Sequence, residues 1–180
     1  WHAHPELRAQ VSPTTIALWR NFPEVPRRIF RLWHDPLLTD EGSLTDTRNY
    51  STYAFGMSNA SIIDFKYADI KAHIISGRIV DEGCADGALL VRIAEDFPDS
   101  DLVGIELTGE LIASCLERQR AGEFGDSFVH FHQRNITSAI FQPGTVDSTI
   151  CNSTLHELWS YNDRESTVME YLRLKYLQLA

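Results

Sequence analysis

From Arg78 onward, short apolar runs alternate with segments whose apolar residues recur at helical spacing. The apolar runs predict four strands, which begin at Ile79–Val80 and continue in residues 101–107, 127–136 and 145–153. The periodic segments predict helices over residues 88–97, over residues 109–122, and from Asn162 or Asp163 to Leu179. Strands and helices that alternate through such short connections imply an α/β fold with a doubly wound, mainly parallel sheet.

The first 58 residues lack this alternation and predict a helical extension. Ser12 and Pro13 are typical of a helix start, and a second helix is expected after Pro23. Residues 35–58 carry turn formers and an aromatic cluster, which predicts a loop. A helix from about Asn59 to Ile75 then leads into the first strand. We therefore expect a helical extension with a loop over 1–58 and a sheet domain over 59–180.

The acidic charge lies almost wholly in the expected sheet domain. Residues 49–180 hold ten basic and nineteen acidic side chains, whereas residues 1–48 hold six of each. An acidic domain is a poor match for a phosphate backbone, so we expect no nucleic-acid partner. The three cysteines are widely spaced and form no Cys-x-x-Cys motif, and neither a signal peptide nor a long apolar span is found. We therefore expect a cytoplasmic protein whose cysteines are reduced thiols, without a metal site or a membrane span.

The segment "IVDEGCADG", residues 79–87, combines a strand end, a tight turn and a helix start. Gly83 and Gly87 allow the chain to turn and a ligand to approach closely. Backbone N–H groups and the helix dipole converge on a ligand at such a place. Glu106 ends the second strand, where a carboxylate can accept hydrogen bonds from both ribose hydroxyls. The two features together predict a nucleoside ligand.

The acids of this turn decide which nucleoside is expected. A dinucleotide site has the pattern G-x-G-x-x-G, which residues 83–88 match only in part. Asp81 and Asp86 would repel a pyrophosphate, which disfavours a nicotinamide-dependent oxidoreductase. The same acids suit a ligand with a cationic amino group and no phosphate, such as the methionine end of S-adenosylmethionine.

Over roughly Gly77 to Ala180, the sequence resembles the class I S-adenosylmethionine-dependent methyltransferases, which have a Rossmann-like fold. "IVDEGCADG" is similar to the family's first motif, with Ala85 in place of the middle glycine. "GIELTGELIASC" resembles the segment whose acid, here Glu106, binds the ribose, with Leu107 beside the adenine. The resemblance implies S-adenosylmethionine as the cofactor. The contacts that it implies in these two motifs are Asp81, Gly83, Cys84, Ala85, Gly87, Glu106 and Leu107.

Two later segments extend the resemblance. After the third strand, Asn135 stands where the family often has an acid that contacts the adenine amino group, and Ile136 is expected against the ring. "DSTICNSTLHEL" resembles the fourth-strand motif, with Cys151, Asn152 and Ser153 at the border of the cofactor. The Asn/Asp-Pro-Pro-Tyr/Phe tetrad of many amino-group methyltransferases is absent. The resemblance therefore implies methylation of an oxygen or nitrogen of a small molecule.

His156 is the candidate general base, because an imidazole titrates near neutral pH, and Glu157 is expected to orient it. An ordinary capping or core hydrogen bond is the alternative role for His156. Methyl transfer depends mainly on alignment, so a base is not essential. Tyr50, Tyr53 and Phe55 are expected either to close over cofactor and substrate, as such segments do in the family, or to pack in the core.

The sequence ends after the helix that follows the fourth strand, whereas a class I domain has seven strands. The fourth strand is therefore expected at an open edge of the sheet, which proteins usually cover. Three explanations stay open: a fragment of a longer protein, a second chain that supplies the missing strands, or a homodimer. A non-catalytic or partner-dependent half of a split methyltransferase is accordingly the alternative to a self-sufficient enzyme.

Overall fold

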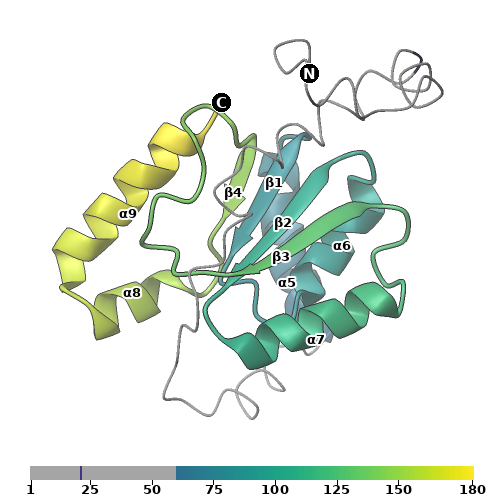
Figure 1. Cartoon of the computed structure of the whole chain (residues 1–180), viewed down its shortest axis with the longest axis horizontal. Coiled ribbons are helices and arrows are strands. Elements are labelled where there is room, and N and C mark those ends of the chain that lie inside the picture. The colour runs from purple at the N-terminus through teal and green to yellow at the C-terminus, as the bar shows by residue number, and fades with distance from the viewer. Residues whose placement is uncertain (1–20, 22–59) are drawn as a thin grey trace, which may run out of the picture. The chain divides into compact units, whose positions relative to one another are not determined.

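The computed structural model describes Asn21 and residues 60–180, and the latter form helices around a four-stranded sheet (Figure 1). These elements belong to one unit of the chain, residues 40–180. The strands are β1 (Arg78–Glu82), β2 (Asp101–Glu106), β3 (Phe128–Gln133) and β4 (Ser148–Ile150). The helices are α5 (Ala60–Ile70), the short 3₁₀ helix η2 (Lys71–His73), α6 (Ala88–Asp96), α7 (Gly109–Arg120), α8 (Leu155–Tyr161) and α9 (Arg164–Gln178).

The sheet has the strand order β3-β2-β1-β4, and all of its neighbouring strands are parallel. Val80 in β1 lies opposite Val103 in β2 and Thr149 in β4. β4 is an edge strand of the sheet in the part of the chain that the structure describes. The predicted α/β fold with a parallel sheet is therefore confirmed.

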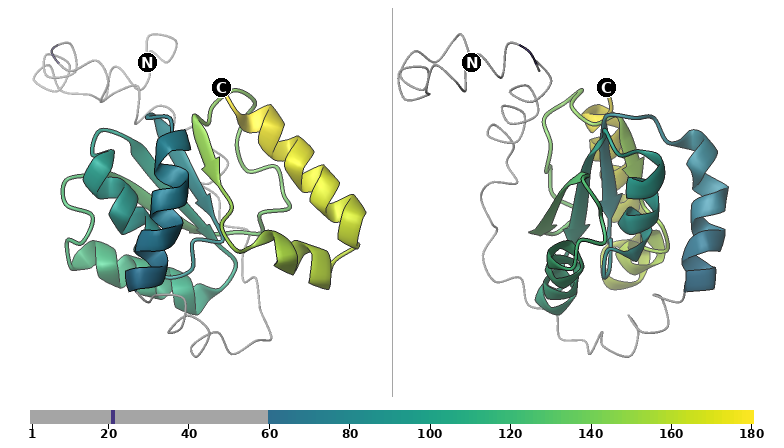
Figure 2. Two further views of the ribbon diagram at one scale, coloured as in Figure 1. Left: turned by 180° about the vertical axis from the view of Figure 1, so that it is seen from behind. Right: turned by 90° about the vertical axis from the view of Figure 1, so that its right-hand side faces the viewer.

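One face of the sheet carries the main apolar core, beneath α5, α6 and α7. Alternate strand residues such as Ile79, Leu102 and Val129 point to this face, where they cluster with Leu90 and Ile93 of α6. Figure 2 shows α5 and α6 together on this side of the sheet. α5 precedes β1 and α6 follows it, so the core holds both helices against the sheet. It thereby positions β1, whose end leads into the glycine turn.

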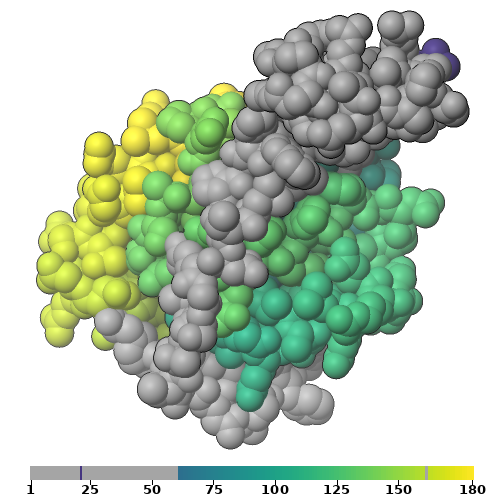
Figure 3. Space-filling model, viewed as in Figure 1, coloured from purple at the N-terminus to yellow at the C-terminus, as the bar shows by residue number. Residues whose placement is uncertain are grey.

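The opposite face is covered in part by α9, whose buried side is polar. Tyr171 donates a 2.5 Å hydrogen bond to Glu82 Oε2, and Lys175 Nζ lies 2.8 Å from Glu82 Oε1. All three side chains are buried. Met169 and Tyr176 on the same helix are instead 59% and 78% exposed, and Figure 3 shows α9 at the molecular surface. A buried ion pair therefore replaces the usual apolar contact between this helix and β1.

The predicted elements occur in the predicted order, with differences at their ends. The third strand ends at Gln133 because its neighbour β2 ends at Glu106, whose carbonyl accepts the N–H of Arg134. Only Ser148–Ile150 of the predicted fourth strand form a ladder with β1. The seven-residue helix α8 was not predicted, because so short a segment shows little apolar periodicity.

The predicted extension, residues 1–58, lies outside the described residues except for Asn21. The helices expected after Ser12 and Pro23, the loop and the boundary at residue 58 therefore stay predictions. Among residues 60–180, none of the helices combines the length and the apolar character that crossing a membrane requires.

Candidate functional site

The turn between β1 and α6 is as tight as the sequence predicts. Gly83, Ala85 and Gly87 all have positive φ angles, of 75°, 50° and 81°. The N–H groups of Gly83 and Cys84 both donate to the carbonyl of Ile105, at 2.8 and 3.1 Å. The turn is thus fastened to β2, and its backbone faces the end of the sheet where both strands finish.

The glycines of the turn are required by close packing within the protein. A Cβ atom on Gly83 would lie 2.4 Å from Thr154 Oγ1, and one on Gly87 would lie 3.3 Å from Phe131 Cε1. Gly104 in β2, which the sequence analysis missed, is equally constrained, because its Cβ would lie 2.5 Å from Phe131 Cδ1. The sequence suggested that these glycines allow a ligand to approach closely. The structure shows that packing within the protein also requires them.

Asp81 is a buried carboxylate at the end of β1, with only 2% of its surface exposed. Within residues 60–180 it makes no hydrogen bond and no ion pair. Burial, followed by the negative charges of Glu82 and Glu106, raises the pKa of Asp81 to about 7. The positive charge of Lys66 offsets this rise only in part. A buried acid without an ion-pair partner is costly to ionise, and a cationic ligand group reduces that cost.

Glu106 ends β2 and is held by three backbone donors. Its Oε1 accepts from the N–H groups of Leu107, at 2.8 Å, and Thr108, at 3.0 Å, and its Oε2 accepts from Ala85, at 3.1 Å. Burial raises the pKa of Glu106, against the lowering effect of these N–H groups. The structure thus brings Asp81 and Glu106 together beside the turn, as the sequence predicts.

Asp86 has a different role from the one expected. Its Oδ2 lies 2.6 Å from Nη2 of Arg118 in α7, and its Oδ1 accepts the N–H of Ala88 at the start of α6. The charge of Asp86 therefore ties two helices to the turn. Of the two acids that the sequence assigned to a cationic ligand group, Asp86 is held in an ion pair with Arg118, whereas Asp81 forms no ion pair within residues 60–180.

Two further predicted contacts lie in the same turn region. The Cys84 thiol is buried beneath the turn, and a hydrogen bond with Cys115, followed by burial, raises its pKa. Only the backbone of Cys84 is therefore presented at the turn. Leu107 is half-buried, directly beyond Glu106.

The predicted adenine contacts follow β3. Ile136 is buried, and Asn135 is half-buried. Asn135 Oδ1 already accepts from the N–H of Thr137, at 3.0 Å, and from its hydroxyl, at 2.8 Å. Since a carbonyl oxygen has two lone pairs, an adenine amino group would have to replace one of these donors. The role of Asn135 stays a prediction.

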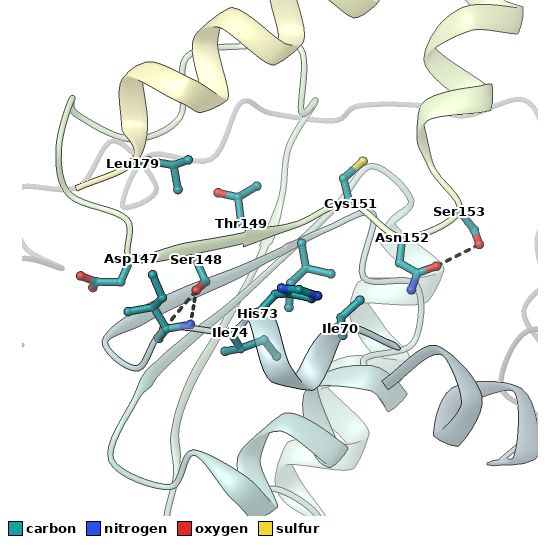
Figure 4. A pocket seen from close by; sticks show the side chains of 12 residues that line it. Ile70, His73, Ile74, Asp147, Ser148, Thr149, Cys151, Asn152, Ser153 and Leu179 are labelled. Atoms are coloured by element: carbon teal, nitrogen blue, oxygen red, sulfur yellow. Dashed lines mark hydrogen bonds between the residues drawn. The ribbon is translucent and has the colours of Figure 1, made fainter. Parts of the chain in front are cut away.

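The segment after β4 lines a cavity of about 490 Å³ along the open edge of the strand. Figure 4 shows Cys151, Asn152 and Ser153 at one end of it and Leu179 at the other. The Ser153 hydroxyl donates to Asn152 Oδ1 at 3.1 Å. The predicted fourth-strand contacts thus lie at the end of this cavity that is next to the carboxyl end of β4.

The predicted catalytic pair lies in the first turn of α8. His156 Nε2 is 3.3 Å from Glu157 Oε1, the orienting contact that the sequence suggested, and the His156 side chain is 60% exposed. Its role as a base stays a prediction. The aromatic residues Tyr50, Tyr53 and Phe55 lie outside the described residues.

Sequence reasoning missed the polar cluster of Glu82, Tyr171 and Lys175, to which Cys151, expected at the border of the cofactor, also belongs. Burial, followed by the charge of Glu82, raises the pKa of Tyr171, and burial raises the pKa of Cys151 to about 11. A second acid, Glu82, directly after Asp81 at the end of β1 was the available signal. The cluster joins α9 to the last residue of β1, directly before the turn at Gly83.

Comparison with known proteins agrees with this architecture. A family profile described as "Methyltransferase domain" matches residues 76–173, and no curated protein sequence matches the chain. Among solved structures, a SAM-dependent methyltransferase from Aquifex aeolicus has a TM-score of 0.58 at 14% identity, over 71% of this chain and 66% of that one. A protein from Methanococcus maripaludis, assigned as such a methyltransferase, has 0.55 at 15% identity, over 77% and 63%.

A third solved structure, CalS10, is an amino pentose methyltransferase from Micromonospora echinaspora. It has a TM-score of 0.52 at 22% identity, over 76% of this chain and 55% of that one. The chain thus spans less than two thirds of the length of these three structures. The shared fold confirms the Rossmann-like architecture. The profile match covers more than half of the sequence, and the chain therefore belongs to the methyltransferase domain family.

Proposed function

We propose that this chain binds S-adenosylmethionine and acts in methyl transfer to an oxygen or nitrogen of a small molecule. The observation that carries the proposal is the buried Asp81 carboxylate, which forms no hydrogen bond and no ion pair within residues 60–180 and lies beside Glu106. An ammonium group is the complement of the first acid, and vicinal hydroxyls are the complement of the second. S-Adenosylmethionine carries both groups.

Asp81, Glu106 and the glycine turn each bind a different part of the cofactor. Asp81 holds the ammonium group, Glu106 accepts the ribose hydroxyls, and the glycine turn keeps the backbone close to the ligand. The bound cofactor supplies a methyl group on a sulfonium, which is a good leaving group. The task left to the protein is to hold acceptor and methyl group in line and to exclude water.

A small-molecule acceptor is supported by the acidic charge of the domain and by the absence of the tetrad that marks many amino-group methyltransferases. CalS10, which shares the fold, is an amino pentose methyltransferase. His156, paired with Glu157, is exposed to an incoming acceptor and suits the removal of a proton from a hydroxyl or amine. We assign it that role.

Cys84, Cys115 and Cys151 are free thiols, which favours the cytoplasm as the location of the protein.

We also propose that a further strand covers the open edge of β4. The backbone N–H of Asp147 donates to the Arg78 carbonyl in β1, so the alternate residues Val146 and Ser148 direct their backbone groups to the other side. Val146 already forms a parallel bridge with Leu179 there. A strand from a second chain or a second copy would extend this pairing, and activity would then depend on that partner. Sedimentation of the chain alone, and with candidate partners, tests this requirement.

Calorimetric titration of the chain with S-adenosylmethionine and, separately, with NADH tests the cofactor proposal. Saturable binding of S-adenosylmethionine alone supports it. Binding of NADH alone would contradict it and favour an oxidoreductase. A folded chain that binds neither would favour the alternative, a half-domain whose site forms only with its partner.

A further inference from the structure

Ala85 in the glycine turn has a backbone that is held from two sides. Its N–H donates to Glu106 Oε2 at 3.1 Å, and its carbonyl accepts a hydrogen bond from the thiol of Cys115, with 3.2 Å between sulfur and oxygen. The φ angle of Ala85 is 50°, which a residue other than glycine adopts only where its surroundings hold it there. Side chains from β2 and α7 therefore keep this residue in place.

Cys115 makes this contact from within the core. It lies in the middle of α7, and none of its surface is exposed. A thiol is a weak donor, but solvent does not compete for a hydrogen bond at a fully buried position. The fit is close, because a Cβ atom on Gly87 would lie 3.3 Å from the Cys115 sulfur. Cys115 therefore acts on the turn from beneath.

A second contact from the same side of α7 supports the first. Arg118 follows Cys115 by three residues, a spacing that places both side chains on one side of a helix. Its Nη2 lies 2.6 Å from Oδ2 of Asp86, the residue after Ala85. α7 thus holds two consecutive residues of the turn, one by its carbonyl and the other by its carboxylate.

The two contacts of Ala85 depend on each other, because its N–H and its carbonyl are joined through one Cα atom. Without the thiol, Ala85 would relax toward the right-handed region, and its N–H would turn away from Glu106 Oε2. Oε1 would keep its donors, the N–H groups of Leu107 and Thr108. The carboxylate would then be held on one side only.

We propose that Cys115 is a positioning residue for cofactor binding. Its thiol holds Ala85 in the left-handed conformation, and Ala85 in turn orients the Glu106 carboxylate toward the ribose hydroxyls. This inference rests on the proposed function, because it requires that Glu106 receive the ribose of S-adenosylmethionine. It gives α7 a part in binding through a residue that does not itself touch the ligand.

Calorimetric titration of Cys115 variants with S-adenosylmethionine tests the inference. Cys115→Val removes the donor at similar volume, and we expect roughly three- to tenfold weaker binding. Cys115→Ala also lacks the donor and adds no atom beside Gly87, so it should give the same result. Cys115→Ser keeps a hydroxyl donor and should bind more tightly than either. Unchanged affinity in Cys115→Val and Cys115→Ala would overturn the inference.

Ser114→Ala is the matched control. It removes a donor from the same helix, where the Ser114 hydroxyl donates to the Glu110 carbonyl at 3.2 Å and not to the turn. Its affinity for S-adenosylmethionine should equal that of the wild-type chain. Weakening as large as that in Cys115→Val would show that any lost donor in α7 has this effect, and would overturn the special role of Cys115.

The Glu106→Ala background separates positioning from a general loss of structure. There, Cys115→Ala has no carboxylate to orient and should weaken binding less than twofold further. Equal weakening in both backgrounds would show that Cys115 acts on the fold as a whole, which would overturn the inference alone. A wild-type chain that does not bind S-adenosylmethionine would instead overturn the proposed function, and this inference with it.

Discussion

The backbone N–H of Ala85 donates a 3.1 Å hydrogen bond to Oε2 of Glu106, which joins the turn after β1 to the end of β2. Ala85 adopts a φ angle of 50°, in the left-handed region that glycine favours. The position of the carboxylate and the conformation of the turn therefore depend on each other. A change that disturbs the turn should weaken ligand binding and stability together.

Gly83→Ala should be strongly destabilising. The new Cβ would lie 2.4 Å from Thr154 Oγ1, and the backbone there has a φ of 75°. We expect a loss of about 3 kcal/mol in the free energy of unfolding, measured by chemical denaturation. Adding Thr154→Ala should restore part of the loss, because it removes the steric clash but not the strain. No recovery in the double variant would contradict the packing explanation.

Lys175→Met should cost roughly 3–5 kcal/mol in the free energy of unfolding, because it leaves the buried Glu82 carboxylate without its cation. Glu82→Leu combined with Lys175→Met removes both charges and should be much closer to the wild type. Denaturant titration of the two single variants and the double variant measures the coupling. Additive losses would show that the ion pair does not join α9 to β1.

The ionisation of Asp81 should make stability depend on pH. Its pKa is about 7 in the folded protein and 3.8 in the reference state, so the folded state holds the proton longer as pH rises. The free energy of unfolding should therefore fall between about pH 4 and about pH 7, by at most about 4 kcal/mol. Asp81→Asn should remove this decline. Asp99→Asn, at an exposed position, is the control and should retain it.

Cofactor affinity should show the opposite dependence on pH. Only the ionised Asp81 attracts an ammonium group, so binding of S-adenosylmethionine should weaken about tenfold for each unit below about pH 7. The α-amino group stays protonated in this range, since its pKa is about 8. Calorimetry between pH 5 and 7 measures the slope, and Asp81→Asn should bind weakly at every pH. An equal slope in that variant would assign the titration to another group.

The sheet and the two main site carboxylates were predictable because their signals are local. The alternation of apolar runs and helical periods predicts the elements, and the positions of Asp81 and Glu106 at two strand ends place them at the same edge. The turn between them was predictable from Gly83 and Gly87.

The remaining features depend on contacts between residues far apart in sequence. Asp86 meets Arg118 and Glu82 meets Tyr171 across separations of 32 and 89 residues. No local sequence pattern indicates either pair. The sequence therefore suggested Asp86 as a ligand contact and did not indicate that the buried side of α9 is polar. Gly104 is required only because Phe131 on β3 packs over it. Such constraints arise from the packed structure.

The most direct test of the cofactor site is the affinity for S-adenosylmethionine of the wild-type chain and of Glu106→Ala. Glu110→Ala is the control, because Glu110 is exposed in the first turn of α7. We predict saturable binding to the wild type and the control, and at least tenfold weaker binding to Glu106→Ala. Equal affinity in all three chains would contradict the assignment of Glu106 to the ribose and, with it, the proposed site.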